Sequence, residues 1–323
     1  MEKARQESLR KAYGETLVEL GRENKDIVVL EADLGKSTMS ALFKEKFPER
    51  YFEMGIAEQN MASVSAGLAL AGKIPFYSTF AVFASGRAYD QIRCSIAIPK
   101  ANVKICGSSC GLSDFGDGKT HQSVEDANIV RAIPNMTVLN PCDAGETKKM
   151  VRAMALYRGP VYIRINRNDL PVYTAEDEKF EIGKIYPVLD SGAGQAEVCI
   201  FATGVMVSKS VEAAEVLKKS GIGVQVLNVS TLKPLLKKEI LKYAGGKRVI
   251  VTAEEAVKTG GLGNTIAAIL AEETALPGEI PASFVQIAIE DTFGASAHGY
   301  EELLEEYGLN TNSICNAVKK ALR

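Results

Sequence analysis

The sequence contains no tryptophan and only two histidines, His121 and His298, among 323 residues. Any reaction that needs an imidazole as acid or base must therefore use one of these two side chains. The six cysteines form no Cys-x-x-Cys pair and no cluster with histidine, which argues against a zinc site or a disulfide framework. We expect the cysteines to be small buried side chains.

The chain also lacks a long apolar run and a strong charge of either sign. Its most apolar stretch, residues 61–72, is interrupted by two serines and is too short to span a membrane. The N-terminus has no apolar signal core. A formal net charge of −2 at pH 7 argues against a nucleic-acid partner. We therefore expect a soluble cytoplasmic protein that binds neither membrane nor nucleic acid.

Apolar strand-like runs alternate with helical segments along the whole chain. This alternation predicts an α/β fold with mostly parallel sheets flanked by helices, beginning with an amphipathic helix over residues 5–23. The length is sufficient for two domains. Residues 172–195 are charged and then rich in glycine, as is typical of a linker. We therefore expect two consecutive domains, residues 1–171 and residues 196–323.

One glutamate stands at the start of an apolar helix. Residues 51–56 read as a short strand and turn, and residues 58–71 as a helix whose circumference should be mostly buried. Burial favours the neutral carboxyl group and a helix N-terminus favours the ionised one, so Glu58 is expected to exchange a proton readily. A favourable interaction with the helix dipole is the simpler explanation of the same residue.

A second strand, over residues 74–80, leads into a second helix. Phe80 and Phe83 are three positions apart and therefore lie on one face of that helix. In a parallel sheet, both strand-to-helix turns open at the same edge, where ligands of such folds bind. Glu58 and the two phenylalanines are therefore expected at one site.

Three short motifs fall at this expected edge: Gly-Ile-Ala-Glu58-Gln, Tyr-Ser-Thr-Phe80 and, after a polar glycine-rich loop, Asp117-Gly-Lys-Thr-His121-Gln. They resemble the pyrimidine-binding domain of thiamine diphosphate enzymes, most closely the transketolases. The resemblance implies that Glu58 shares a proton with the aminopyrimidine ring of the cofactor, so that the thiazolium ring can lose its own. It also implies that Phe80 stacks on the pyrimidine and that Phe83 lines the same pocket.

The same resemblance implies residues that bind the cofactor or the substrate near a third strand, expected over residues 27–33. The motif Asp33-Leu34-x-x-Ser37 follows this strand and is similar to a transketolase motif. Asp33 and Leu34 would lie near the cofactor, and Ser37 would help to hold the substrate phosphate. Capping of the following helix is an equally good explanation of Ser37.

Two arginines and the loop motif complete the implied substrate site. Arg10 matches a phosphate-binding arginine of transketolases, and Arg167-x-x-Leu-Pro resembles the loop whose arginine binds the sugar phosphate. Guanidinium groups suit that task because they offer paired, planar donors. Asp117 would meet a substrate hydroxyl, and His121 would face the reacting carbonyl. A solvated helix face explains Arg10 nearly as well, and an isolated histidine after a loop is otherwise a surface or capping residue.

One glycine-rich motif of the sequence is similar to a metal-binding motif only over three residues. Gly116-Asp117-Gly118 mimics the motif by which thiamine enzymes bind magnesium and diphosphate. That motif continues into a helix and an asparagine ligand, whereas this one runs directly into Thr-His-Gln. We therefore expect no metal ligand in this chain.

Full-length transketolases begin with a large domain that binds the diphosphate and the metal, and this sequence has no counterpart. The chain therefore resembles the C-terminal subunit of a split transketolase, inactive alone. The resemblance implies thiamine diphosphate bound between two chains, with magnesium or calcium held by an N-terminal transketolase subunit, in a dimer of heterodimers. The implied reaction moves a two-carbon ketol unit from a ketose phosphate to an aldose phosphate, as in the pentose phosphate pathway.

Three departures from the family pattern leave the identity of the donor and acceptor sugars undecided. Ser109 stands where transketolases commonly have a histidine, Gly116 replaces an acidic residue, and Gly86 takes the place of an aromatic residue. The alternatives are a deoxyxylulose phosphate synthase, a 2-oxo acid dehydrogenase beta subunit and a non-catalytic interaction module. The loop motif and the Arg167 motif favour phosphorylated sugars over decarboxylating partners. The resemblance implies a structural role for the C-terminal domain, and its function in this chain stays open.

Overall fold

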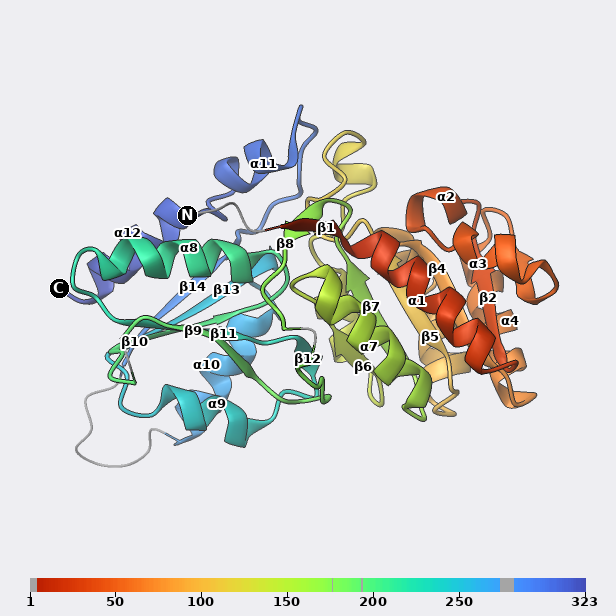
Figure 1. The fold of residues 1–323 in the computed structure, drawn as a ribbon, viewed down its shortest axis with the longest axis horizontal. Helices are drawn as coiled ribbons and strands as arrows, with labels where there is room; N and C mark the ends of the chain where they lie inside the picture. Colours follow the sequence, from red (N-terminus) through yellow and green to blue (C-terminus); the bar gives the residue numbers. More distant parts are fainter. Residues whose placement is uncertain (1–4, 176, 193, 274–281) are drawn as a thin grey trace.

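Two large sheets organise the chain, one in each half of the sequence (Figure 1). The computed structural model describes residues 5–175, 177–192, 194–273 and 282–323. In both halves strands alternate with helices, and most neighbouring strands run parallel. The expected α/β fold with mostly parallel sheets flanked by helices is therefore confirmed.

The first sheet has seven strands in the order β12-β6-β7-β5-β4-β2-β3. Only β12 runs antiparallel to its neighbour. Its central strands are almost entirely buried, as expected for a parallel sheet covered on both faces. The bounds are β2 (Ile27–Glu31), β3 (Tyr51–Glu53), β4 (Ile74–Phe80), β5 (Lys104–Ser108), β6 (Thr137–Leu139), β7 (Val161–Ile165) and β12 (Thr231–Lys233).

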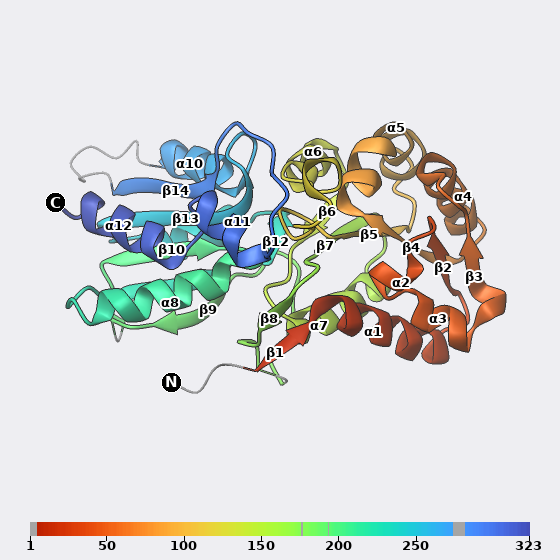
Figure 2. The same ribbon diagram turned by 90° about the horizontal axis from the view of Figure 1, so that it is seen from above.

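Helices cover both faces of this sheet (Figure 2). One face carries α1, α2, α3 and α7, and the other carries α4, α5 and α6. The first helix forms because apolar side chains recur every three or four residues and are buried along one side. The bounds are α1 (Leu9–Glu23), α2 (Gly35–Thr38), α3 (Ala41–Lys46), α4 (Glu58–Leu70), α5 (Tyr89–Gln91), α6 (Asp126–Ala132) and α7 (Ala144–Leu156).

The second sheet has the order β14-β13-β10-β11-β9, with β9 antiparallel at one edge. Helices α8 and α12 lie on one face, and α9 and α10 on the other (Figure 1). The strands are β9 (Tyr186–Asp190), β10 (Val198–Ala202), β11 (Val224–Asn228), β13 (Val249–Val257) and β14 (Ser283–Ile289). The helices are α8 (Met206–Lys218), α9 (Lys237–Ala244), α10 (Leu262–Glu273), α11 (Tyr300–Glu306) and α12 (Thr311–Ala321).

Two strands lie outside the simple division of the chain into two halves. β12 belongs to the second half of the sequence, yet it forms an edge of the first sheet. β9 lies inside residues 172–195, which the sequence predicts as a linker, so part of that segment is an edge strand. The glycines and charges that flank β9 dominate the composition there and hide the strand.

Two element boundaries differ from the sequence predictions. The helix predicted from residue 5 begins at Leu9, because β1 (Gln6–Ser8) pairs with β8 (Asp169–Pro171). The Ser8 side chain then accepts a hydrogen bond from a backbone amide in the first turn of α1. The strand predicted over residues 27–33 ends at Glu31, and Asp33 adopts a left-handed φ of 59° that turns the chain away from the sheet.

The prediction that α4 is mostly buried is wrong for the single chain. Its buried side consists of Glu58, Met61, Ala62, Ser65 and Ala66. The opposite side, which includes the exposed residues Val64 and Leu70, faces outward because α4 lies on the outer surface of the first domain. Like every other helix in the described part of the chain, α4 is not a candidate to cross a membrane.

The cysteines are buried as expected, with one exception. Five of the six are buried free thiols, whereas Cys94 is exposed. Cys94 lies in a π-helical segment, Ile92–Ala97, that follows α5 on the outer surface of the first domain. The prediction of a buried side chain is therefore wrong for Cys94.

A buried carboxylate holds the turn that follows β2. Glu31 is fully buried and accepts hydrogen bonds from the hydroxyl groups of Thr38 and Ser40 and, at 3.2 Å, from the backbone amide of Ala32. Burial raises the pKa of Glu31 to about 7, although the hydroxyl donors oppose that shift. The carboxylate thereby ties the C-terminal end of α2, the turn that carries Ser37, to the end of the strand.

We expect Glu31 to make the stability of the chain depend on pH. Its pKa of about 7 in the folded state lies above the ordinary value of 4.5, so between these values the folded state holds a proton that the unfolded state has released. The free energy of unfolding should therefore fall as pH rises through this window. A Glu31→Gln variant should lack that contribution, of roughly 1–3 kcal/mol between the two ends of the window.

The measurement is urea unfolding of the wild-type chain and of Glu31→Gln at a series of pH values. Other buried acids titrate in both proteins, so the difference between the two curves isolates Glu31. Glu45→Gln, at an exposed position on α3, is the matched control and should run parallel to the wild type. Parallel curves for Glu31→Gln as well would contradict the prediction.

Candidate active site

Glu58 occupies the first position of α4, and its side chain is almost completely buried. Both of its carboxylate oxygens accept hydrogen bonds from Nη1 of Arg87, at 2.9 and 3.0 Å. The Arg87 side chain itself remains 43% exposed. The buried negative charge is therefore balanced by a cation that reaches it from the surface. Sequence reasoning missed Arg87, although its position one helical turn after Phe83 was a usable signal.

An aromatic cluster lies next to this ion pair. The rings of Phe80 and Phe83 are stacked with their centroids 6.2 Å apart. The guanidinium carbon of Arg87 lies 4.3 Å from the centre of the Phe83 ring. The ring of His121 meets both phenylalanines edge-on, at 5.5 Å from Phe83 and 6.3 Å from Phe80. The structure thus brings together residues from three separate segments of the sequence, as expected.

The local backbone explains how these side chains converge. Phe80 ends β4, and the following Phe83–Arg87 segment is a π-helical turn. A π-helical turn contains one more residue per hydrogen-bonded loop than an α-helix and shifts the side chains that follow it. This turn brings Arg87 over the Phe83 ring and against Glu58.

Two arginines meet on the other side of the loop motif. Nη1 of Arg10 donates to the backbone carbonyl of Ser37 at 2.8 Å, and Nη1 of Arg167 donates to Oδ2 of Asp114 at 2.9 Å. Burial lowers the pKa of Arg10, and the positive charge of Arg167 lowers it further. Nε of Arg10 is buried and has no hydrogen-bond partner among the described residues. Two like charges and an unpartnered donor suit this place to an anion.

Asp114 belongs to the same site but was missed by sequence reasoning. Burial raises its pKa, Arg167 opposes that shift, and the nearby charges of Asp117 and His121 act in opposite directions. The backbone amide of Gly118 donates to the carbonyl of Asp114 at 3.2 Å, and the amide of His121 donates to the carbonyl of Gly118 at 2.9 Å, so the loop motif lies beside the Arg167–Asp114 pair. Asp117 is exposed. The loop therefore connects the aromatic cluster to the arginines.

The Asp33-Leu34-x-x-Ser37 motif surrounds the short helix α2. The Asp33 side chain is exposed, and its backbone amide donates to Oε1 of Glu53 at 2.8 Å. Leu34 is half-buried and precedes α2 directly. Ser37 lies inside α2 rather than before the next helix, so it is not the cap of that helix.

The three departures from the family pattern have structural consequences. A Cβ atom added at Gly86 or at Gly116 would meet no atom of the chain within 4 Å. Ser109 adopts a left-handed φ of 53°, and its buried hydroxyl has no partner among the described residues. Strained backbone of this kind is concentrated at functional sites. The two glycines leave room beside the site that a larger side chain would fill.

The glycine-rich segment that leads into α10 forms a tight turn. Gly260 has a left-handed φ of 72°. The backbone amides of Leu262 and Gly263, at the start of the helix, donate to the carboxylate of Glu254 at 2.8 and 2.9 Å. The anion that this helix N-terminus favours is therefore supplied by the chain itself.

We expect Glu58 and Arg87 to be energetically coupled. Removing one partner of a buried pair leaves an uncompensated charge or unused donors, so each single glutamine variant should lose stability, and the double variant less than the sum. The expected coupling is about 1–3 kcal/mol, below the value for a fully buried pair because Arg87 is half-exposed.

The measurement is a double-mutant cycle of Glu58→Gln and Arg87→Gln by urea unfolding of the isolated chain. The control cycle combines Glu58→Gln with Arg93→Gln, since Arg93 is an exposed arginine of the same surface segment. That cycle should give a coupling of less than about 0.5 kcal/mol. Equal couplings in the two cycles would mean that the Glu58–Arg87 pair is not formed in solution.

Both halves of the chain are similar to proteins of the same family. Residues 5–172 match the model of the transketolase pyrimidine-binding domain, and residues 191–314 match that of the transketolase C-terminal domain. A putative transketolase C-terminal section from Methanocaldococcus jannaschii is 43% identical over 98% of this chain and 96% of its own length. Rat transketolase is 38% identical over 96% of this chain but only 48% of its own length.

A solved structure described as a split gene transketolase, an inactive beta4 tetramer, has a similar fold. It is 43% identical to this chain, and the match covers 98% of both chains with a TM-score of 0.85. Both halves of the chain thus match one family in sequence and in fold. The chain therefore belongs to the transketolase family, of which it comprises the pyrimidine-binding and C-terminal domains.

Proposed function

We propose that the chain is the C-terminal subunit of a two-chain transketolase. It would transfer a two-carbon ketol unit from a ketose phosphate to an aldose phosphate, in the cytoplasm and within the pentose phosphate pathway. The observation that carries this proposal is the buried carboxylate of Glu58 beside the stacked rings of Phe80 and Phe83. Residues 1–171 would form the catalytic domain, residues 172–195 the connection, and residues 196–323 the C-terminal domain.

The contacts of Arg87 support a place for the pyrimidine ring of thiamine diphosphate. Its guanidinium group is a flat cation that donates to Glu58 and lies over the Phe83 ring. A protonated aminopyrimidine is also flat, cationic and a donor, so the same carboxylate and ring suit it. Glu58 would share a proton with that ring, Phe80 would stack on it, and Phe83 would line the pocket.

The rest of the cofactor would lie between this chain and a partner. Asp33 and Leu34, at the end of β2, would contact the cofactor from this side, while an N-terminal transketolase subunit would hold the diphosphate with magnesium or calcium. When bound, thiamine diphosphate would supply the carbon nucleophile that carries the ketol unit. This chain would supply the proton acceptor, the ring contacts and the walls that exclude water.

The substrate would lie between the loop and the two arginines. Arg10 and Arg167 would bind the sugar phosphate through their guanidinium groups. Ser37 is close enough for its backbone carbonyl to accept from Arg10 and would contribute to the same phosphate site. Asp117 would accept from a substrate hydroxyl, and His121 would act as the acid or base at the reacting carbonyl.

An exposed apolar surface supports association with other chains. The outward side of the first domain carries Ile56, Leu70 and Ile98, which are 76%, 75% and 63% exposed. Large apolar side chains that are exposed in one chain are stabilised when a second chain covers them. We propose that partner subunits cover this surface in a dimer of heterodimers, and that the isolated chain is inactive.

The direct test mixes the purified chain with its N-terminal partner and measures ketol transfer. We expect activity only in the mixture with thiamine diphosphate and magnesium or calcium. The Glu58→Gln variant should still bind the cofactor but lose roughly 10²- to 10⁴-fold in turnover, because a proton-transfer group is lost. Glu45→Gln, an exposed position, should keep wild-type rates.

Three results would contradict the proposal. Full activity of this chain without a partner would exclude the two-chain enzyme, and unchanged turnover in Glu58→Gln would remove Glu58 from the reaction. Release of carbon dioxide from pyruvate would identify a deoxyxylulose phosphate synthase or 2-oxo acid dehydrogenase type of enzyme instead.

The phosphate assignment predicts a selective effect on KM. Arg10→Gln and Arg167→Gln should each raise KM for phosphorylated sugars by roughly 10- to 100-fold, the cost of one or two hydrogen bonds to a charged group. Their KM for an unphosphorylated acceptor such as glycolaldehyde should change little. Arg22→Gln, on the exposed side of α1, is the control. Equal changes for both kinds of acceptor would contradict the assignment.

A further inference from the structure

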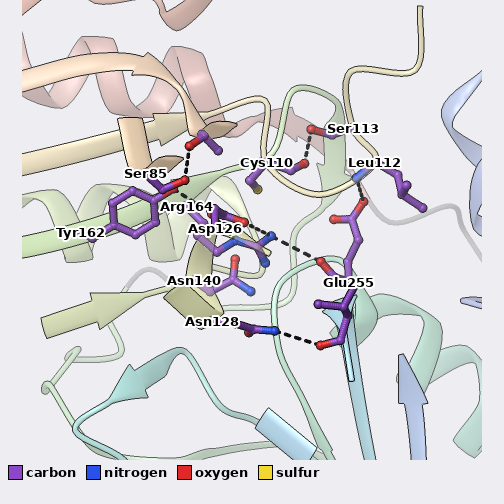
Figure 3. A network of polar contacts seen from close by, with 12 residues as sticks. Ser85, Cys110, Leu112, Ser113, Asp126, Asn128, Asn140, Tyr162, Arg164 and Glu255 are labelled. Carbon is purple, nitrogen blue, oxygen red and sulfur yellow. Dashed lines mark hydrogen bonds and ion pairs between the residues drawn. The ribbon is translucent and has the colours of Figure 1, made fainter. Parts of the chain in front are cut away.

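The loop that carries Asp117 and His121 is held from the second domain. We call residues 110–122 the substrate loop. The backbone amide of Leu112, at its start, donates to Oε1 of Glu255 at 2.9 Å. Glu255 lies on β13 of the second sheet and is buried. Figure 3 shows its carboxylate extending from the second domain to the Leu112 amide.

The contact between Glu255 and the loop is tight. Gly111 has a left-handed φ of 62°, and a Cβ atom there would lie 2.3 Å from the carboxyl carbon of Glu255. A side chain at this position would therefore displace the carboxylate. Glycine adopts a positive φ without strain and has no Cβ atom, so it allows the loop to turn directly over Glu255.

A second residue of the C-terminal domain orients the carboxylate. The hydroxyl group of Tyr300, at the start of α11, donates to Oε1 of Glu255 at 2.8 Å. The same hydroxyl accepts from Nδ2 of Asn166 at 2.8 Å. Asn166 directly precedes Arg167, the proposed phosphate ligand. A continuous chain of hydrogen bonds therefore links the start of the substrate loop to the end of β7 through two residues of the other domain.

The remainder of the substrate loop is also bound by the second domain. Nε2 of Gln122 donates to the carbonyl of Ala295 at 2.9 Å, and the amide of Ala297 donates to the carbonyl of Phe115 at 2.9 Å. A Cβ atom at Gly118 would lie 2.2 Å from Oγ of Ser296. The segment before α11 thus runs along the loop that includes His121.

A buried ion pair of the first domain holds the backbone of Glu255 (Figure 3). Arg164 on β7 donates twice to Asp126, at 2.9 and 2.7 Å, and both side chains are fully buried. Nη2 of Arg164 also donates to the backbone carbonyl of Glu255, at 3.3 Å. The backbone of Glu255 is therefore fixed on the first domain while its side chain holds the loop.

We propose that Glu255 and Tyr300 are positioning residues for the substrate loop, so that the C-terminal domain sets the place of Asp117 and His121 in the reaction. This inference rests on the proposed function for the roles of these two loop residues. The C-terminal domain then contributes to turnover of the sugar without touching the cofactor. Within the described part of the chain, the hydrogen bonds of Glu255 and Tyr300 involve none of Glu58, Phe80 and Phe83, so the pyrimidine site should be unaffected by their loss.

The chain provides a closely matched control in the neighbouring residue. Glu254 is also on β13 and also buried, but its carboxylate accepts from the start of α10 within its own domain. Glu254→Gln therefore disturbs a buried carboxylate of the same strand without touching the substrate loop. Tyr300→Phe is the mildest test variant because it deletes one oxygen atom, and it serves if Glu255→Gln does not fold.

The first measurement is hydrogen exchange of the isolated, full-length chain, followed by mass spectrometry. We expect exchange in peptides covering residues 110–122 to be about tenfold faster in Tyr300→Phe and Glu255→Gln, because one hydrogen bond that closes the loop is weakened. Peptides covering β10 should be unchanged, and Glu254→Gln should leave the substrate loop at the wild-type rate. Wild-type exchange in Tyr300→Phe, or equal acceleration in Glu254→Gln, would overturn the proposal.

The second measurement uses the chain reconstituted with its partner. We expect kcat/KM for the sugar phosphate to fall about tenfold in Tyr300→Phe while the Kd for thiamine diphosphate stays at the wild-type value. A general loss of structure would change both. If no ketol transfer is found in any protein, the proposed function fails, but the exchange experiment still decides whether the C-terminal domain holds the loop.

Discussion

The site depends on the burial of one carboxylate, that of Glu58. A buried carboxylate is costly unless a cation or several donors compensate it, and in this chain Arg87 does so from the surface. The same cation lies over the ring of Phe83, so the charge balance and the aromatic cluster form one unit. A site that already fits a flat cationic donor is suited to a flat cationic ligand, and that fit connects the structure to the chemistry of the family.

Two further buried carboxylates hold the loops around this unit. Glu31 fixes the turn that carries Ser37, and Glu255 fixes the start of the substrate loop. Burial raises the pKa of each to about 7. Such groups cost stability when they ionise, so their presence at two loops of one site indicates that loop geometry is favoured over stability. The C-terminal domain takes part because it supplies one of the two.

The fold and the central residues could be predicted from the sequence because they follow from periodicity and from contiguous motifs. Strand and helix patterns gave the parallel sheet, and strand ends placed Glu58, Phe80 and His121 at one edge. Neither a contiguous motif nor periodicity identified Arg87 or Glu255, although the spacing of Arg87 from Phe83 was a usable signal. Their partners are 29 and 143 positions away in the sequence, and a charged residue on a helix or strand is usually solvated or paired locally. Burial and pairing across such separations are properties of the assembled fold.

The burial of α4 on one side only is also a property of the assembled fold, and it is relevant to association with other chains. The apolar composition of residues 58–71 indicated burial of most of the helix circumference, whereas a single chain covers only one side. Apolar side chains that one chain leaves exposed are stabilised when a second chain covers them. Glu58 stands at the first position of this helix, on its buried side, so a chain that covers the outer side would contact the helix that carries the carboxylate. In the proposed two-chain enzyme, association would therefore be linked to the site through one helix, which would give a physical reason for a subunit that is inactive alone.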